Sequence, residues 1–112
     1  MIAPDDAAAL LGNRMTAEQQ AWAYPQLVAE SGRAAREMAL GSIAVDPAGI
    51  RCPTLVLGAE HDRITPPSVE RRIAAHYGSE YLEAVGHAHM LMLEEGWELL
   101  FGQVLSWLAR VM

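Results

Sequence analysis

The chain has 112 residues, of which 52% are hydrophobic, and a formal net charge of -6. This length and composition predict one packed domain, or part of one, rather than a disordered tail. The acidic balance and the scattered arginines argue against a nucleic-acid partner. A single cysteine, no secretory signal pattern and no apolar run of about 18 residues predict a cytoplasmic protein without a membrane partner.

Residues 1–49 predict short helices rich in alanine. Thr16 and Gln19 have the spacing of a capping box, which indicates a short helix directly after Thr16. Pro25 suits the first turn of a second helix, and Gly41 suits its end. The residues before Thr16 are expected to be irregular, with one helical turn.

Residues 50–112 have a different pattern, in which short apolar runs alternate with helical periodicity. The elements expected here are a strand over 54–57, a helix capped by Thr65 and ended by Gly78, a strand over 81–85 and a helix from Trp97. The first strand is continuously apolar, as strands covered on both faces are. The order predicts an α/β fold with two parallel strands joined by a crossover helix.

An acidic residue and an imidazole follow these two expected strands. Asp62 lies in G-A-E-H-D-R-I-T-P-P, and His89 ends V-G-H-A-H. Because adjacent parallel strands lie about 5 Å apart, groups beyond their carboxyl ends can come within hydrogen-bonding distance. A carboxylate so placed fixes the tautomer of the imidazole. His87 is the competing imidazole, and in the simplest alternative Asp62 only stabilises its own turn.

The same segment offers a metal-binding alternative. His87, His89 and Glu94 form H-x-H-x4-E, which resembles the first metal motif of cupins, and zinc or iron accepts such ligands. Tyr81 stands where a cupin carries Gly, and no second cupin motif follows. We therefore expect neither a metal nor a cofactor, and a small metal-binding protein remains the less favoured alternative.

The two segments together resemble a known family. I-R-C-P-T-L-V-L-G-A-E-H-D-R-I-T-P-P is similar to the acid-bearing segment of α/β-hydrolases. V-G-H-A-H-M-L-M-L-E is similar to their histidine segment, usually P-G-x-G-H with Glu five positions after the His. Val85 and Ala88 replace the usual Pro and second Gly. Aligning His89 with the family histidine places Glu94 correctly, whereas aligning His87 leaves that Glu seven positions away, so we favour His89.

The resemblance implies a partial α/β-hydrolase fold, with residues 50–112 as its C-terminal segment and residues 1–49 as a helical lid-like segment. Asp62 and His89 would be the catalytic acid and base of an esterase-like enzyme acting on a small-molecule ester. No serine lies in the G-x-S-x-G elbow that exposes a nucleophile; the serines are Ser31, Ser42, Ser68, Ser79 and Ser106. We therefore expect a C-terminal fragment of a serine hydrolase that is inactive alone.

A second hypothesis assigns the same scaffold to a noncatalytic binding or oligomerisation module. Two parallel strands make a poor independent sheet, and the strand over 54–57 would present an unpaired apolar edge. If the chain is a hydrolase fragment, we expect self-association or aggregation through this edge unless the helices of residues 1–49 fold over it.

Overall fold

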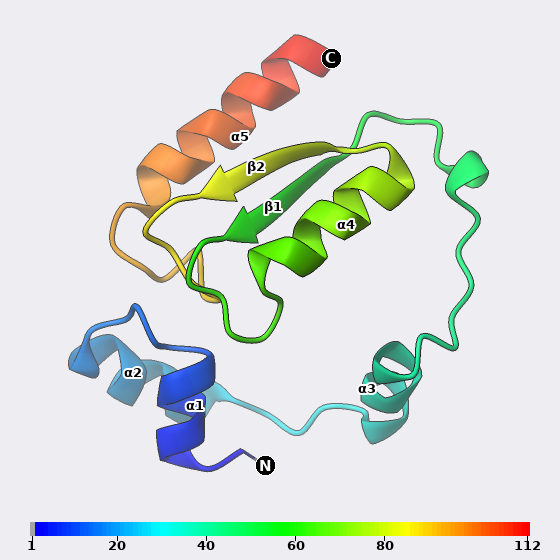
Figure 1. The fold of residues 1–112 in the computed structure, drawn as a ribbon. Helices are drawn as coiled ribbons and strands as arrows, with labels where there is room; N and C mark the ends of the chain where they lie inside the picture. The colour runs from blue at the N-terminus through cyan, green and yellow to red at the C-terminus, as the bar shows by residue number, and fades with distance from the viewer. Residues whose placement is uncertain (1) are drawn as a thin grey trace.

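The computed structural model describes residues 2–112 as a mixed α/β chain with five α-helices and a two-stranded parallel sheet. The helices are α1 (Pro4–Leu10), α2 (Ala17–Ala23), α3 (Gly32–Ala39), α4 (Pro67–Tyr77) and α5 (Trp97–Val111), and the strands are β1 (Leu55–Ala59) and β2 (Glu80–Ala84) (Figure 1). Short 3₁₀ turns cover Tyr24–Gln26 and Pro47–Gly49. Within this described range, no helix is long and apolar enough to cross a membrane.

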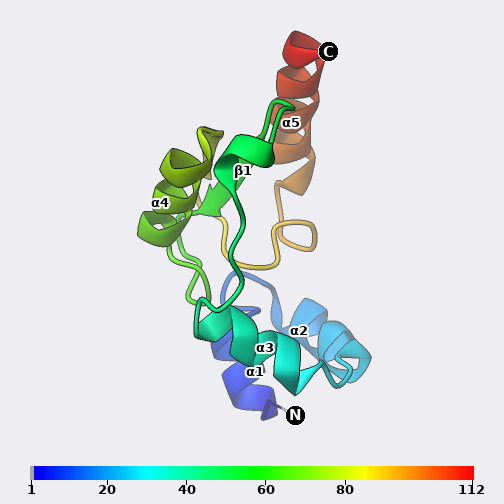
Figure 2. The same cartoon turned by 90° about the vertical axis from the view of Figure 1, so that its right-hand side faces the viewer.

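The sheet confirms the expected parallel pair with a crossover helix. β1 and β2 pair with Leu57 opposite Leu82 and Ala59 opposite Ala84, and α4 connects them. Helices α4 and α5 cover opposite faces of the sheet (Figure 2). On the α5 side, Leu100 packs with Ala59 and Ala84 to form the buried core, because these side chains alternate onto one face of the strands.

The α4 face of the sheet is built around a glycine. A Cβ added to Gly58 would lie 2.8 and 2.9 Å from two ring carbons of Tyr81, so the phenol ring crosses the strand where it has no side chain. Arg71 of α4 lies with its guanidinium carbon 5.4 Å from the centre of that ring and forms an ion pair with Glu83. The aromatic ring therefore joins α4 to the sheet, and Gly58 makes its close approach possible.

The capping box at Thr16 and the helix end at Gly78 are confirmed, and the N-terminal residues are more helical than expected. The capping box forms, with Thr16 and Gln19 each bonding the backbone of the other. Gly78 ends α4 in the left-handed conformation, with φ of 63°. The helical part expected before Thr16 is present but longer than one turn, because Pro4 begins α1, a helix of seven residues whose first turn is acidic.

The predicted helix from Pro25 to Gly41 was wrong in its first half. The chain makes one 3₁₀ turn at Pro25 and is extended from Leu27 onward. A new helix begins after Ser31, whose side chain accepts a hydrogen bond from the Ala34 amide. In a continuous helix the Ala34 amide would bond a backbone carbonyl of the preceding turn. The Ser31 hydroxyl accepts that bond instead, so a separate helix starts after Ser31.

Both strand boundaries differ from the predicted ones by one or two residues. β1 begins at Leu55 and continues to Ala59, and β2 begins at Glu80 rather than Tyr81. The Glu80 amide donates to the Thr54 carbonyl at 3.0 Å, which starts the pairing earlier on the second strand. Inter-strand hydrogen bonds, which local periodicity does not encode, set these limits.

The described chain is less compact than a self-contained domain of its size. Its radius of gyration is 15.6 Å, against about 13 Å expected for this length. Its accessible surface is 8079 Å², against about 6,100 Å² for a typical 12.2 kDa globule. Helix α3 lies apart from the sheet (Figure 1). The helix and the residues directly after it carry exposed apolar side chains: Met38, Leu40, Ile43 and Val45. Much apolar surface is therefore left uncovered.

Candidate functional site

Asp62 organises the turn that follows β1. Its Oδ1 accepts hydrogen bonds from the amides of Ile64 and Thr65, at 2.7 and 3.0 Å, and its Oδ2 accepts from the Thr65 hydroxyl at 3.0 Å. Thr65 therefore does not cap α4 as the sequence predicted. Pro66 occupies the cap position and makes no side-chain bond, because its ring carries no acceptor, and the Thr65 hydroxyl bonds the carboxylate instead.

The same carboxylate binds the imidazole of His89. Nδ1 of His89 lies 3.0 Å from Oδ2 of Asp62, and the two side chains are 31% and 8% exposed. Burial raises the pKa of Asp62, but the hydrogen bonds from His89, from the Thr65 and Ile64 amides and from the Thr65 hydroxyl outweigh it and leave the pKa below its ordinary value. An ionised carboxylate only accepts hydrogen bonds, so Nδ1 donates, and in the neutral imidazole Nε2 is then the nitrogen with the free lone pair.

The structure thus brings together the two residues that the sequence singled out across 27 positions. The turn-stabilising role and the imidazole-orienting role of Asp62 are not alternatives, because one carboxylate performs both. No hydrogen-bond partner for His89 Nε2 is found among residues 2–112. The arrangement provides an oriented, partly exposed base.

His87 pairs with a different carboxylate. Its Nδ1 lies 3.2 Å from Oε2 of Glu94, and the same oxygen accepts from the Ala88 amide at 2.7 Å. Glu94 is 2% exposed, and its Oε1 has no partner among the described residues. Glu94 therefore holds the backbone just before His89 in place, and the buried His87 supports this loop rather than facing Asp62.

This separation bears on the metal-binding alternative. His87 and His89 each bind their own carboxylate, and the three residues of the H-x-H-x4-E motif do not converge. Across residues 2–112, no three His, Cys, Asp or Glu side chains are grouped so that they could hold a metal ion. The geometry gives that alternative no support.

Backbone contacts hold the two loops against each other. The Gly86 amide donates to the Glu60 carboxylate at 2.8 Å, and the His61 amide donates to the His87 carbonyl at 2.8 Å. Glu60 and His61 directly precede Asp62, while Gly86 and His87 precede His89. The relative position of acid and base is therefore fixed by bonds on both loops, which is what precise orientation of a base requires.

The segment between α1 and α2 contacts both loops, an arrangement that the sequence did not reveal. Asn13 Nδ2 donates to the His61 carbonyl and Arg14 Nε donates to the Gly86 carbonyl, each at 2.9 Å. Figure 1 shows α1 and α2 beside the carboxyl ends of the strands. Side-chain bonds to distant carbonyls leave no periodic signal, so only the folded chain shows them.

No serine in the described chain is hydrogen-bonded to His89. The local partners of the serines are the Ala34 amide for Ser31, the Glu37 carbonyl for Ser42, the Thr54 hydroxyl for Ser79 and the Gly102 carbonyl for Ser106, and Ser68 is exposed in α4. The site therefore presents an acid and a base, and none of these bonds activates a serine.

Comparison with known protein families, with curated proteins and with solved structures finds no match to this chain. The geometry of the Asp62–His89 pair and its surroundings is the basis for a functional assignment.

Proposed function

We propose that Asp62 and His89 are the acid and base of an esterase-like serine hydrolase with a partial α/β-hydrolase fold, and that a polypeptide segment outside residues 2–112 supplies the nucleophile. The observation that carries the proposal is the 3.0 Å bond between His89 Nδ1 and the buried carboxylate of Asp62. This bond joins a carboxylate to a partly exposed imidazole beyond the carboxyl ends of adjacent parallel strands, where open α/β sheets carry their reactive groups, and it supports these roles.

The chemistry follows from the tautomer that Asp62 selects. With Nδ1 donating to the carboxylate, Nε2 of His89 takes the proton of a serine hydroxyl as the serine oxygen attacks the acyl carbon of an ester. The imidazolium then gives this proton to the departing alcohol, which leaves an acyl-serine. Water attacks the acyl-serine while His89 accepts one of its protons; the imidazolium then returns this proton to the departing serine oxygen, which frees the acid product and regenerates the serine hydroxyl. Asp62 stabilises the imidazolium throughout.

The incomplete packing of the chain supports a missing partner segment. Both outer edges of the two-stranded sheet lack a neighbour among residues 2–112, and such an edge pairs readily with a further strand. A strand added beside β1 would bring its own carboxyl end next to the Asp62 turn. We propose that the nucleophile is carried there, and that α1 and α2 cover the site as a lid.

A fluorophosphonate probe tests the proposal, because it reacts only with an activated serine. We expect the coding sequence upstream of residue 1 to contain G-x-S-x-G, and the extended polypeptide to react with the probe. His89→Ala should abolish the reaction. His87→Ala should weaken it less, because His87 acts on the loop and not on the serine.

The outcomes separate cleanly. Labelling that is unchanged in the His89→Ala variant removes the imidazole from the mechanism. Labelling of the 112-residue chain itself refutes the placement of the nucleophile elsewhere.

A noncatalytic binding or oligomerisation module is the second candidate, favoured by the apolar surface of α5. Its exposed side chains include Leu99, Phe101 and Leu105, at 78%, 51% and 49% exposure. If an extended polypeptide stays unreactive while the 112-residue chain forms a defined oligomer, this second candidate replaces the first.

A further inference from the structure

A hollow in the described chain lies between α1 and α2. Its volume is about 340 Å³, within the range of small-molecule sites. Five alanines of the two helices contribute to its walls: Ala7, Ala8, Ala17, Ala21 and Ala23. Short side chains at these positions leave space between the helices that longer apolar residues would fill. The hollow is therefore a consequence of the alanine-rich composition of this segment.

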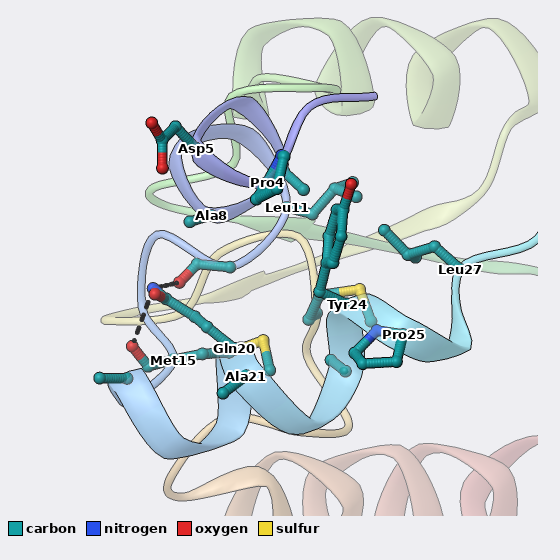
Figure 3. Close-up of a pocket in the computed structure, with 15 residues that line it drawn as sticks. Pro4, Asp5, Ala8, Leu11, Met15, Gln20, Ala21, Tyr24, Pro25 and Leu27 are labelled. Atoms are coloured by element: carbon teal, nitrogen blue, oxygen red, sulfur yellow. Dashed lines mark hydrogen bonds between the residues drawn. The ribbon is translucent and has the colours of Figure 1, made fainter. Parts of the chain in front are cut away.

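The larger side chains around the hollow are apolar or aromatic. Leu11, Met15 and Tyr24 line it together with Met90, and Figure 3 shows Tyr24 and Leu11 beside each other between the helices. Met90 directly follows His89, and consecutive Cα atoms lie about 3.8 Å apart. The wall of the pocket thus begins at the residue next to the base.

The polar and charged side chains that line the pocket determine whether it suits a charged or a neutral ligand. Gln20 Nε2 donates to the carbonyls of Gly12 and Met15, at 2.8 and 3.3 Å, and the Tyr24 hydroxyl donates to the Ile2 carbonyl at 3.0 Å. These donors are therefore already engaged. Among residues 2–112, the one charged lining residue is Asp5, whose carboxylate points away from the other lining side chains (Figure 3), and no Arg, Lys or His lines the pocket.

We infer that this alanine-walled pocket binds an uncharged apolar acyl or alkyl group, and that it selects neutral hydrophobic esters for the Asp62–His89 site. A cavity of about 150 Å³ accepts benzene, so 340 Å³ accommodates a group of roughly ten non-hydrogen atoms. An anionic group would lose its hydration without gaining a cation or a free donor from the described lining residues. The ester identity rests on the proposed function, whereas the preference for a neutral apolar group rests on the pocket alone.

Methyl-carbon NMR of ¹³C-labelled methionines tests the inference in the unmodified 112-residue chain. Met15 and Met90 line the pocket, while Met38 and Met92 are 69% and 80% exposed and serve as internal controls. Hexanamide should shift the Met15 and Met90 signals and leave the control signals in place. Hexanoate, of the same length but charged, should bind at least about tenfold more weakly.

A pair of matched variants locates the binding. Ala21→Phe fills the pocket from an exposed helix position and should remove the hexanamide shifts, whereas Ala35→Phe makes the same change in α3, away from the pocket, and should preserve them. Equal affinity for hexanoate, or shifts confined to the control methionines, overturns the inference.

The two proposals fail separately. Acyl transfer by the extended polypeptide without a Met15 or Met90 shift removes the pocket and leaves the proposed function. Binding of hexanamide at those methionines without acyl transfer leaves the pocket as a neutral-ligand site and removes the hydrolase.

Discussion

Replacing Asp62 by Asn probes the acid–base pair with almost no change in shape. The Asn Oδ1 can still accept from the Ile64 and Thr65 amides, which bond one carboxylate oxygen at 2.7 and 3.0 Å. At the other position an NH₂ group replaces the oxygen that accepts from His89 at 3.0 Å. Two donors would then face each other, so the imidazole must move its proton to Nε2 and accept through Nδ1.

The cost of this substitution follows from the bonds that change character. Two amide bonds to a carboxylate become bonds to a neutral oxygen, and charge-assisted bonds contribute about 1.5 to 3 kcal/mol against about 1 kcal/mol for neutral ones. We expect Asp62→Asn to lower the free energy of unfolding by about 1 to 3 kcal/mol at pH 7. In the extended polypeptide the effect on turnover should be far larger, about 10⁴-fold, because the base has the wrong tautomer.

Long-range ¹H–¹⁵N correlation spectra of the imidazoles measure the tautomer directly in the 112-residue chain. At pH 8 the wild-type His89 should carry its proton on Nδ1, and the Asp62→Asn variant should carry it on Nε2. Glu94→Gln is the matched control, because it makes the same chemical change beside His87 and should leave the His89 tautomer unaltered. Urea unfolding of the same samples gives the stability difference.

Two results would refute this reasoning. A wild-type His89 protonated on Nε2 would mean that the carboxylate does not select the tautomer. A change of the His89 tautomer in Glu94→Gln as large as in Asp62→Asn would mean that the two pairs are not independent.

Further predictions address acid stability, packing and association. The pKa of Asp62 is lower in the folded chain than its unfolded value of about 3.9. The ionised carboxylate therefore stabilises the fold fully above that pH, and this contribution is lost as the pH falls through the folded pKa. In urea titrations the difference in unfolding free energy between wild type and Asp62→Asn should close below about pH 4, and a constant difference would contradict the pKa shift. Gly58→Ala should cost about 1 to 3 kcal/mol by thermal unfolding, because the new methyl group meets the Tyr81 ring, and a neutral effect would mean that the ring moves freely. Leu100→Ala should cost about 2 to 4 kcal/mol, whereas Leu99→Ala, at 78% exposure, should cost little; equal costs would place the core elsewhere. Sedimentation velocity should show concentration-dependent self-association through the unpaired strand edge, and a single monomer boundary at all concentrations would contradict it.

Much of the fold was predictable because its signals are local. The Thr16–Gln19 capping box, the left-handed Gly78 and the helical spacing from Trp97 all depend on residues within about one helical turn. The break after Pro25 was missed, because a serine cap competes with helical periodicity and the sequence does not state which one wins.

The sequence predicted the two residues of the candidate site but not the hydrogen bonds that hold them in place. The spacing of the acid and histidine segments pointed to Asp62 and His89 together, and the parallel pairing of two strands brings their loops into contact. Thr65 was read as a helix cap, yet its hydroxyl bonds the carboxylate. A threonine before Pro66 is consistent with both roles, and only the path of the turn chooses between them.

By itself, the sequence determined the order of the elements in residues 50–112, the parallel strand pair and the carboxylate and imidazole that follow it, because these depend on periodicity, turn chemistry and spacing along the chain. Only the tertiary structure decided that His87 binds Glu94 while His89 binds Asp62, since both imidazoles lie within two residues of each other. It also placed α1 and α2 against the two loops and opened the alanine-walled pocket beside Met90. The bonds from Asn13 and Arg14 to the two loops join residues 48 and 72 positions apart. They form only where the folded backbone brings a carbonyl group next to these side chains, which a local sequence pattern does not encode.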